Sequence, residues 1–171
     1  MVNKLKIFNN FNIPNKFKNS IILIGNFDGL HSGHQKLFEL AKKYKTKYKS
    51  KVGVVTFDPI PKMFFNTKIK NYRISNFNQK VIYLKKFGVD FVINKKFDKN
   101  FSKITYYQFI KNILSKKLRS KFIFVSNNFR FGHKREGDVA MLKKFENDFS
   151  YNLINPKPLI KNKKIISSTI I

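Results

Sequence analysis

The chain has 171 residues, of which 42% are hydrophobic, and it carries a formal net charge of +27 with no cysteine. This length fits a single domain, and the hydrophobic fraction is large enough to form a core. A chain without cysteine has no disulfides or thiolate metal sites, and the three histidines, His31, His34 and His133, are too few to close a structural zinc site.

The large positive charge does not by itself indicate a nucleic-acid partner. Lysine dominates the charge, although arginine is the better residue for bidentate recognition of phosphates and bases. The four arginines among the 36 basic residues are Arg73, Arg119, Arg130 and Arg135. Lysine is also spread along the whole chain together with many Asn, Ile and Phe residues, as in a general compositional bias. We therefore expect no specific nucleic-acid partner and only weak, non-specific binding to polyanions.

From the N-terminal residues we expect no targeting signal. No apolar stretch is long enough to cross a bilayer, and residues 1–10 lack the apolar block of a signal peptide. We therefore expect a cytoplasmic protein that does not bind membranes. Residues 1–20 are polar and weakly periodic, and we interpret them as a leading segment without an assigned function. The domain is expected to span residues 21–171.

A strand, a tight turn and a helix are expected where this domain begins. Residues 21–24 are a short apolar run, which is typical of a buried strand. Leu37, Leu40 and Ala41 have helical spacing, and we expect their helix to end near Tyr44. The pattern predicts a glycine-rich turn between a strand and the first turn of a helix.

This turn, residues 25–34, has the composition of an anion-binding site. Its three glycines allow positive φ angles and a close approach of the backbone to a ligand. The first free N–H groups of the following helix point into the same space and favour a negative charge. His31 and His34 are three residues apart and can donate ring N–H bonds to phosphate oxygens.

A second buried strand is predicted over residues 52–57, and the two prolines of residues 58–61 end it, because proline cannot continue a strand ladder. In an open α/β sheet, ligands bind at this carboxyl end of the strands. A rigid loop in that position can therefore line a site, and a simple strand terminator is the alternative interpretation.

The middle of the chain has the pattern of a scaffold. Ser75 is the expected cap of a helix that Gly88 closes, and a strand is predicted over residues 91–93, followed by a loop over 97–101. Thr105 is the expected cap of the next helix. The residues expected to face the core from these two helices are Phe77, Val81, Leu84, Phe87, Phe109, Ile113 and Leu114.

A fourth strand is predicted over residues 121–125, and an unusual loop over 126–138 follows it. This loop combines asparagines, two phenylalanines, two arginines and two glycines, a set that suits a flat ring attached to a phosphate. Asp138 is the expected cap of the next helix, in which Leu142 and Phe145 face inward. A fifth strand is predicted over residues 151–154.

Strands and helices thus alternate along the chain, which predicts an α/β fold: a Rossmann-like open parallel sheet with right-handed crossovers and helices on both faces. The three loops with the composition of sites, 25–34, 58–61 and 126–138, each follow a strand. Because the carboxyl ends of parallel strands meet at one edge of a sheet, we expect the three loops to share one pocket.

Residues 25–29, followed by His-Ser-Gly-His at 31–34, resemble the HxGH signature of the nucleotidylyltransferase superfamily. Further segments follow in the order of one family within it: 56–61 (TFDPIP), 128–132 (NFRFG) with 135–138 (REGD), and 167–169 (SST). With them the chain, from about residue 20 to its last residue, resembles the FMN adenylyltransferase module of prokaryotic bifunctional riboflavin kinase/FAD synthetase.

The resemblance implies the HxGH nucleotidylyltransferase fold and transfer of AMP from ATP to the 5′-phosphate of FMN, giving FAD and pyrophosphate with Mg²⁺. It assigns ATP binding to Gly25, Asn26, Phe27, Asp28, Gly29, His31, His34, Ser168 and Thr169. It assigns FMN binding to Pro59, Pro61, Asn128, Phe129, Phe131 and Arg135. The residues expected in catalysis are His31, His34, Asn128 and Ser168. Metal ligands and the oligomeric state are left open.

The chemistry agrees with this assignment. The phosphate of FMN already carries a charged oxygen that can act as the nucleophile, so no serine, cysteine or general base is required. The protein has to align the attacking oxygen, the α-phosphorus and the leaving pyrophosphate, and to neutralise the growing negative charge. Histidines, lysines, a helix N-terminus and Mg²⁺ can do this without covalent catalysis.

Three features depart from the family pattern. Ile60 stands where the family commonly has a histidine between the two prolines. Ser126 replaces a common glycine, and Asn128 is the amide alternative to an aspartate. The chain ends at Ile171, before the arginine that follows the serine-rich motif, so we expect a domain that is cut at its C-terminal edge. The riboflavin kinase domain that normally follows in the family is not among these residues.

Two alternatives remain at this point. Another adenylyl- or cytidylyltransferase could share the HxGH signature and use a different acceptor. A basic, non-catalytic domain that binds nucleic acid is the alternative from another class, and it would show steep salt dependence of RNA binding without turnover.

Overall fold

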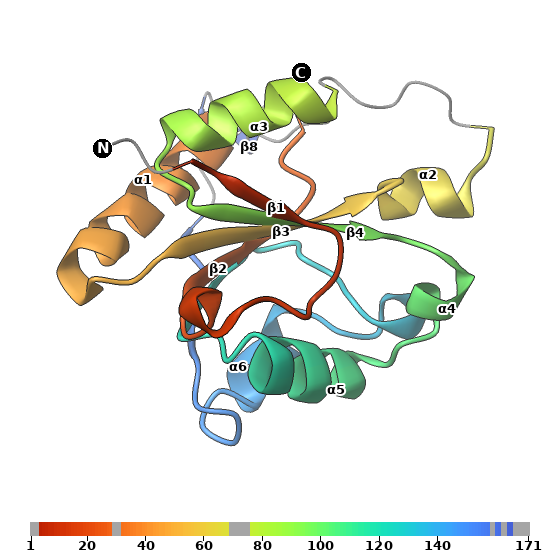
Figure 1. The fold of residues 1–171 in the computed structure, drawn as a ribbon. Coiled ribbons are helices and arrows are strands. Elements are labelled where there is room, and N and C mark those ends of the chain that lie inside the picture. The colour runs from red at the N-terminus through yellow and green to blue at the C-terminus, as the bar shows by residue number, and fades with distance from the viewer. Residues whose placement is uncertain (1–3, 29–31, 69–75, 158–159, 162–163, 166–171) are drawn as a thin grey trace.

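The computed structural model describes residues 4–28, 32–68, 76–157, 160–161 and 164–165. Six parallel strands form one sheet in the order β1-β4-β3-β2-β5-β6 (Figure 1). The strands are β1 (Lys6–Phe8), β2 (Ile21–Ile24), β3 (Val52–Asp58), β4 (Phe91–Lys96), β5 (Phe122–Phe124) and β6 (Asn152–Ile154). A separate antiparallel pair is formed by β7 (Ile160–Lys161) and β8 (Lys164–Ile165).

The connections between the strands are mostly helical. The α-helices are α1 (Ser32–Tyr48), α2 (Pro61–Phe65), α3 (Phe77–Lys86), α4 (Lys99–Ser102), α5 (Tyr106–Gln108) and α6 (Val139–Lys144). The other turns are the 3-10 segments η1 (Asn15–Phe17) and η3 (His133–Arg135) and the π-helical η2 (Phe109–Lys117). None of the helices in the described part of the chain is both long and apolar enough to cross a membrane.

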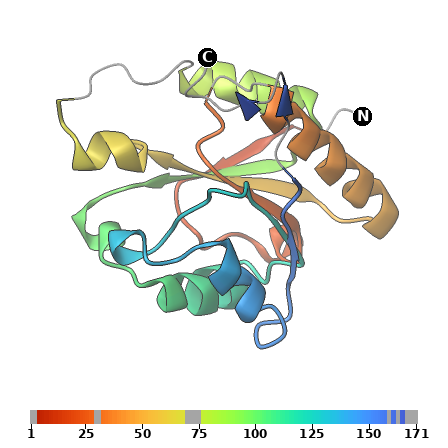
Figure 2. The same cartoon turned by 180° about the vertical axis from the view of Figure 1, so that it is seen from behind.

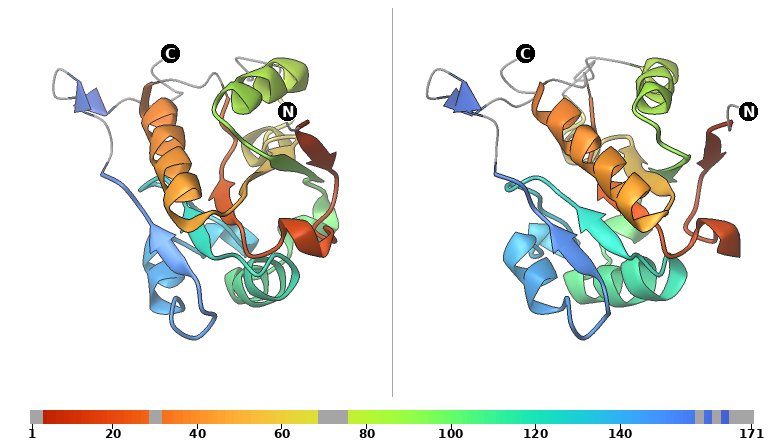
Figure 3. Two further views of the ribbon diagram at one scale, coloured as in Figure 1. Left: turned by 60° about the vertical axis from the view of Figure 1, so that its left-hand side comes forward. Right: turned by 90° about the vertical axis from the view of Figure 1, so that its left-hand side faces the viewer.

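Helices cover both faces of the sheet, as the views in Figure 3 show. Because side chains alternate along a strand, β2 supplies both cores. Ile21 and Leu23 pack with the inner faces of α1 and α3, whereas Ile22 and Ile24 pack with η2 and α6. Figure 2, seen from behind, shows β6 leading towards β7 and β8 on the side of α1 and α3. The predicted α/β class, with a parallel sheet and helices on both faces, is confirmed.

The five predicted strands correspond to β2 through β6, but β1 was not predicted. It lies within residues 1–20 and pairs with β4, with Lys6 opposite Phe91 and Phe8 opposite Ile93. A three-residue edge strand with two exposed residues has no apolar run in its sequence. Its position depends on the edge that β4 offers, which lies more than eighty residues away along the chain.

Some helix bounds also differ from the prediction. The N-cap of α3 is Asn76, whose side chain forms a reciprocal capping box with Gln79, rather than the neighbouring Ser75. The segment 97–101 contains the start of α4, which Asp98 caps, rather than only a loop. The predicted caps Thr105 and Asp138 are confirmed, since each accepts a hydrogen bond from the backbone three residues later.

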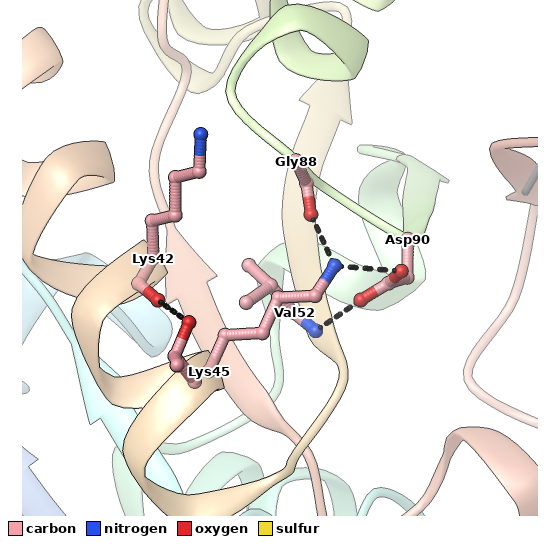
Figure 4. A network of polar contacts seen from close by, with 6 residues as sticks. Lys42, Lys45, Val52, Gly88 and Asp90 are labelled. Atoms are coloured by element: carbon pink, nitrogen blue, oxygen red, sulfur yellow. Dashed lines mark hydrogen bonds and ion pairs between the residues drawn. The ribbon is translucent and has the colours of Figure 1, made fainter. Parts of the chain in front are cut away.

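The amino-terminal edge of the sheet is held by a polar network (Figure 4). The Nζ atom of Lys45, on α1, donates to the Gly88 carbonyl at 2.8 Å and to Asp90 Oδ1 at 3.0 Å. The other oxygen, Oδ2, accepts from the backbone N–H of Val52 at 2.8 Å. One carboxylate therefore joins the end of α1 to the starts of β3 and β4.

Candidate active site

The loops after β2, β3 and β5, which were predicted to line a ligand site, lie at the carboxyl edge of the sheet, opposite the network of Lys45 and Asp90. β2 is hydrogen-bonded to β3 on one side and to β5 on the other. The chain goes from β2 to β3 and β4 in one direction and then crosses to β5 and β6, so the order of the strands reverses next to β2. Such a switch point is where open α/β sheets bind ligands. The turn after β2 thus lies between the loops that follow β3 and β5.

The turn after β2 is bonded to the neighbouring strand β3. Gly25 N donates to Val55 O at 3.1 Å, and Thr56 Oγ1 donates to Asn26 O at 3.4 Å. Phe27 adopts a left-handed φ of 49°, and its side chain is buried. Asp28, which follows, is buried as well. Gly29 and His31 lie outside the described residues.

The expected role of glycine at the start of this turn is corrected. Gly25 is not in the left-handed region, and the left-handed residue in the described part of the turn is Phe27. A Cβ atom at Gly25 would lie 3.1 Å from Cζ of Phe27, so a larger residue there would force the Phe27 ring to shift. The buried ring of Phe27 folds back under the turn and takes that space.

His34 lies in the first turn of α1 and is held by an aromatic contact. Its ring meets the ring of Phe27 edge to face, with 5.3 Å between centroids and an interplanar angle of 76°. Phe27 in turn packs against Phe38, with centroids 5.1 Å apart. The imidazole is half-buried. The turn and the helix therefore fix its position together, at the place where the helix offers free N–H groups.

The loop after β3 is shorter than expected. Pro61 is the first residue of α2, and its preceding residue, Ile60, is the N-cap. Pro59 and Pro61 are half-buried, whereas Ile60 is only 1% exposed. The side chain that departs from the family pattern is therefore packed inside the protein, where an apolar residue is favourable. The prolines remain at the edge of the sheet next to the turn after β2.

The loop after β5 closes on itself and is attached to the segment before α5. Phe131 and Gly137 form an antiparallel bridge with N–H to carbonyl distances of 3.1 and 2.8 Å. His133 N donates to Ile104 O at 2.7 Å. Gly132 has a φ of 80°, and a Cβ atom there would lie only 2.6 Å from Tyr106 N. Both its conformation and its contact with α5 therefore require glycine.

The two phenylalanines of this loop have different surroundings. Phe131 is 8% exposed, belongs to the core and stacks on Phe129 with centroids 5.4 Å apart and an interplanar angle of 15°. Phe129 is half-buried and thus the outer ring of the pair. Asn128 and Arg135 are exposed, and Asn128 Oδ1 accepts a hydrogen bond from Ser126 Oγ at 2.9 Å. Of the two rings, Phe129 is therefore the more exposed.

A buried polar pair beneath the turn after β2 was not predicted. Thr56 is fully buried at the end of β3, and Lys80, on α3, is 5% exposed with its Nζ 3.4 Å from Thr56 Oγ1. A signal was present in the sequence, because Lys80 lies between Phe77 and Leu84 on the inward stripe of its helix. Ser168 and Thr169 lie outside the described residues.

Comparison with known proteins extends these observations. The FAD synthetase family matches residues 13–170. A bifunctional riboflavin kinase/FMN adenylyltransferase of Buchnera aphidicola subsp. Acyrthosiphon pisum is 41% identical over 158 residues, covering 92% of this chain and 50% of that protein. The protein of the same description from Escherichia coli K12 is 35% identical over 151 residues, covering 88% of this chain and 48% of that protein.

A crystal structure described as a macrolide-efflux protein from Streptococcus pneumoniae shares the fold, with a TM-score of 0.79 and 28% identity over 96% of this chain and 53% of that one. The chain spans about half the length of the curated relatives it matches. The family match covers the sheet from before β2 onward, and with it the loops that follow β2, β3 and β5 at the carboxyl edge. The chain therefore belongs to the FAD synthetase family.

Proposed function

We propose that this domain is an FMN adenylyltransferase, which transfers AMP from ATP to the 5′-phosphate of FMN and releases FAD and pyrophosphate. The observation that carries the proposal is the family match over residues 13–170, which contains every loop at the switch point of the sheet. The proposed domain is the expected one, residues 21–171, and its proposed location is the cytoplasm.

The ATP side of the site is assigned to the turn after β2 and the start of α1. Asn26 and Asp28 belong to this turn, and His34 lies where α1 begins. In the proposal, backbone N–H groups and the imidazole bind the triphosphate and stabilise the charge that develops during transfer. His31, Gly29, Ser168 and Thr169 are proposed to complete the ATP site.

Mg²⁺ enters the proposal as part of the substrate, bound to ATP. Within the described ranges, no group of three or more His, Asp or Glu side chains is arranged to hold a metal ion. Mg²⁺ usually binds through substrate phosphates and one or two carboxylates rather than through a complete protein cage. The residues at this edge are compatible with that mode of binding.

The FMN side is assigned to the loops after β3 and β5. Phe129 offers a half-buried ring that Phe131 supports from the core. Asn128 and Arg135 are exposed in the same loop and can bind polar groups of the flavin or its phosphate. Pro59 and Pro61 would border the ring from the neighbouring loop. In this arrangement the attacking phosphate of FMN approaches the α-phosphate of ATP from the β5 side.

The test is a turnover assay with ATP and four acceptors: FMN, NMN, phosphopantetheine and riboflavin. We expect pyrophosphate release and FAD formation with FMN alone. Turnover with NMN or phosphopantetheine would assign the domain to another nucleotidylyltransferase reaction. Binding of RNA that weakens steeply with salt, without turnover of any acceptor, would contradict an enzymatic function.

A further inference from the structure

The buried lysine beneath the turn after β2 has no role in the site as described so far. Among the lysines that the structure describes, Lys80 alone is buried. Its ammonium group lies 3.4 Å from Thr56 Oγ1, and this hydroxyl lies 3.4 Å from Asn26 O. These contacts connect α3 to the turn through the end of β3.

Lys80, Thr56 and the carbonyl of Asn26 form a hydrogen-bond chain whose donor and acceptor roles are fixed. An ammonium group can only donate, so the Thr56 hydroxyl accepts from Lys80 and uses its single proton for the carbonyl of Asn26. Both contacts, at 3.4 Å, are longer than ordinary hydrogen bonds and therefore weak here, and contacts of this kind commonly tighten when the substrate binds. The carbonyl of Asn26 is thereby held towards the interior.

The position of this carbonyl determines where the next N–H group points. The peptide between Asn26 and Phe27 is planar and trans, so the N–H of Phe27 points in the direction opposite to the carbonyl. With the carbonyl directed to Thr56 on β3, this N–H points away from β3. That is the side on which the proposed triphosphate lies.

A lysine in this position is not explained by packing. Lys80 occupies an inward position of α3, where an apolar side chain of similar length would fill the space. Burying an ammonium group costs several kcal/mol, roughly, so a lysine is kept in the interior only where interactions with other groups offset this cost.

We propose that Lys80 is a positioning residue for ATP. Through Thr56 it holds the Asn26 carbonyl and so directs the N–H of Phe27 to the triphosphate, and its charge adds positive potential beneath the turn. The inference rests on the proposed function, because ATP is the ligand of this turn. It predicts that Lys80 and Thr56 act as one unit on ATP and leave FMN unaffected.

The test compares Lys80→Met, Thr56→Val and the double variant with the wild-type chain. Lys85→Met is the matched control, because Lys85 is an exposed lysine on the same helix. Steady-state kinetics give kcat and the KM values for ATP and FMN, calorimetry gives the Kd for Mg-ATP, and thermal unfolding gives Tm.

We expect Lys80→Met and Thr56→Val each to raise the KM and Kd for ATP about tenfold, which is the size of one lost charge-assisted interaction. The double variant should be no worse than either single variant, because the two residues form one unit. Thr56→Ser, which keeps the hydroxyl, should restore ATP binding. The KM for FMN and all values of Lys85→Met should stay unchanged.

The inference is overturned if Thr56→Val leaves ATP affinity unchanged, if the two effects add, or if Lys80→Met lowers Tm without changing ATP affinity. If Lys80→Met does not fold, Thr56→Val and Thr56→Ser still decide the outcome. A wild-type chain that binds ATP without making FAD would contradict the proposed function alone, while the calorimetric comparison would still test Lys80. A wild-type chain that makes FAD with an ATP affinity independent of Lys80 would contradict only the inference.

Discussion

Replacing Asp90 by alanine should destabilise the protein without affecting its chemistry, because this residue holds the edge of the sheet opposite the site. Its Oδ2 accepts from the N–H of Val52, a residue that is 2% exposed. Leaving this buried donor without an acceptor costs about 1–3 kcal/mol. The ion pair with Lys45, whose side chain is 34% exposed, adds about 0.2–1 kcal/mol. The expected loss is therefore about 3 kcal/mol.

For a chain of this size, about 3 kcal/mol corresponds to a decrease in Tm of about 6–12 °C. Asp90→Asn separates the two contributions, because its amide oxygen can still accept from Val52 while the charge is lost. Its Tm should fall by only about 0.4–4 °C. Asp148→Ala removes an exposed carboxylate and serves as the control.

Thermal unfolding followed by circular dichroism measures these differences, and kcat/KM is measured below the melting range. All three variants should keep the wild-type kcat/KM for ATP and FMN. The reasoning is refuted if Asp90→Asn is as unstable as Asp90→Ala, because the ion pair rather than the buried N–H would then dominate. It is also refuted if Asp90→Ala melts no lower than the control.

Three further predictions concern the site and the C-terminal part of the sheet. His34→Ala should lower kcat by about 10²–10³ through loss of a preorganised group, with a nearly native Tm, and near-normal turnover would exclude His34 from catalysis. Phe129→Ala should raise the KM for FMN more than the KM for ATP, and equal increases for the two substrates would contradict the assignment. Phe131→Ala should instead lower the free energy of unfolding by about 3–5 kcal/mol, because Phe131 is in the core. The pKa of Glu146 is lowered, chiefly by the hydrogen bond that its carboxylate accepts from Leu153 N at 2.7 Å, against the opposing effect of burial. Its contribution to stability is therefore present above the ordinary glutamate pKa of 4.5 and is lost as the pH falls through the lower, folded value. Glu146→Gln should weaken this acid-dependent decrease in Tm, and an unchanged pH profile would show that the carboxylate does not contribute.

The strands of the sheet centre could be predicted from the sequence because each is a short apolar run. Ile21–Ile24 is buried on both faces, so its pattern needs no information from elsewhere in the chain. β1 could not be predicted, since only its pairing with β4 distinguishes it from a polar loop. Local hydrogen bonding alone also cannot choose between Ser75 and Asn76 as the cap of α3, because both side chains are good acceptors.

Within the site, residue types were easier to predict than their surroundings. The loop over 126–138 was expected from its composition, but Phe129 and Phe131 are equivalent in the sequence. The bridge between Phe131 and Gly137 decides which ring enters the core. Lys80 was overlooked for a similar reason. A lysine on a helix is usually exposed, and its burial depends on where α3 lies against β3.

The position of β2 also determines when the sheet can be completed during synthesis. The residues of β2 are at most 2% exposed, and its neighbour β5 is synthesised about a hundred residues later. At about 5–20 residues per second, one side of β2 waits on the order of 5–20 s for its partner. An apolar strand with an open edge pairs readily with other chains. A nascent chain that stalls between β4 and β5 therefore exposes an unpaired apolar strand edge, which pairing with β5 then covers.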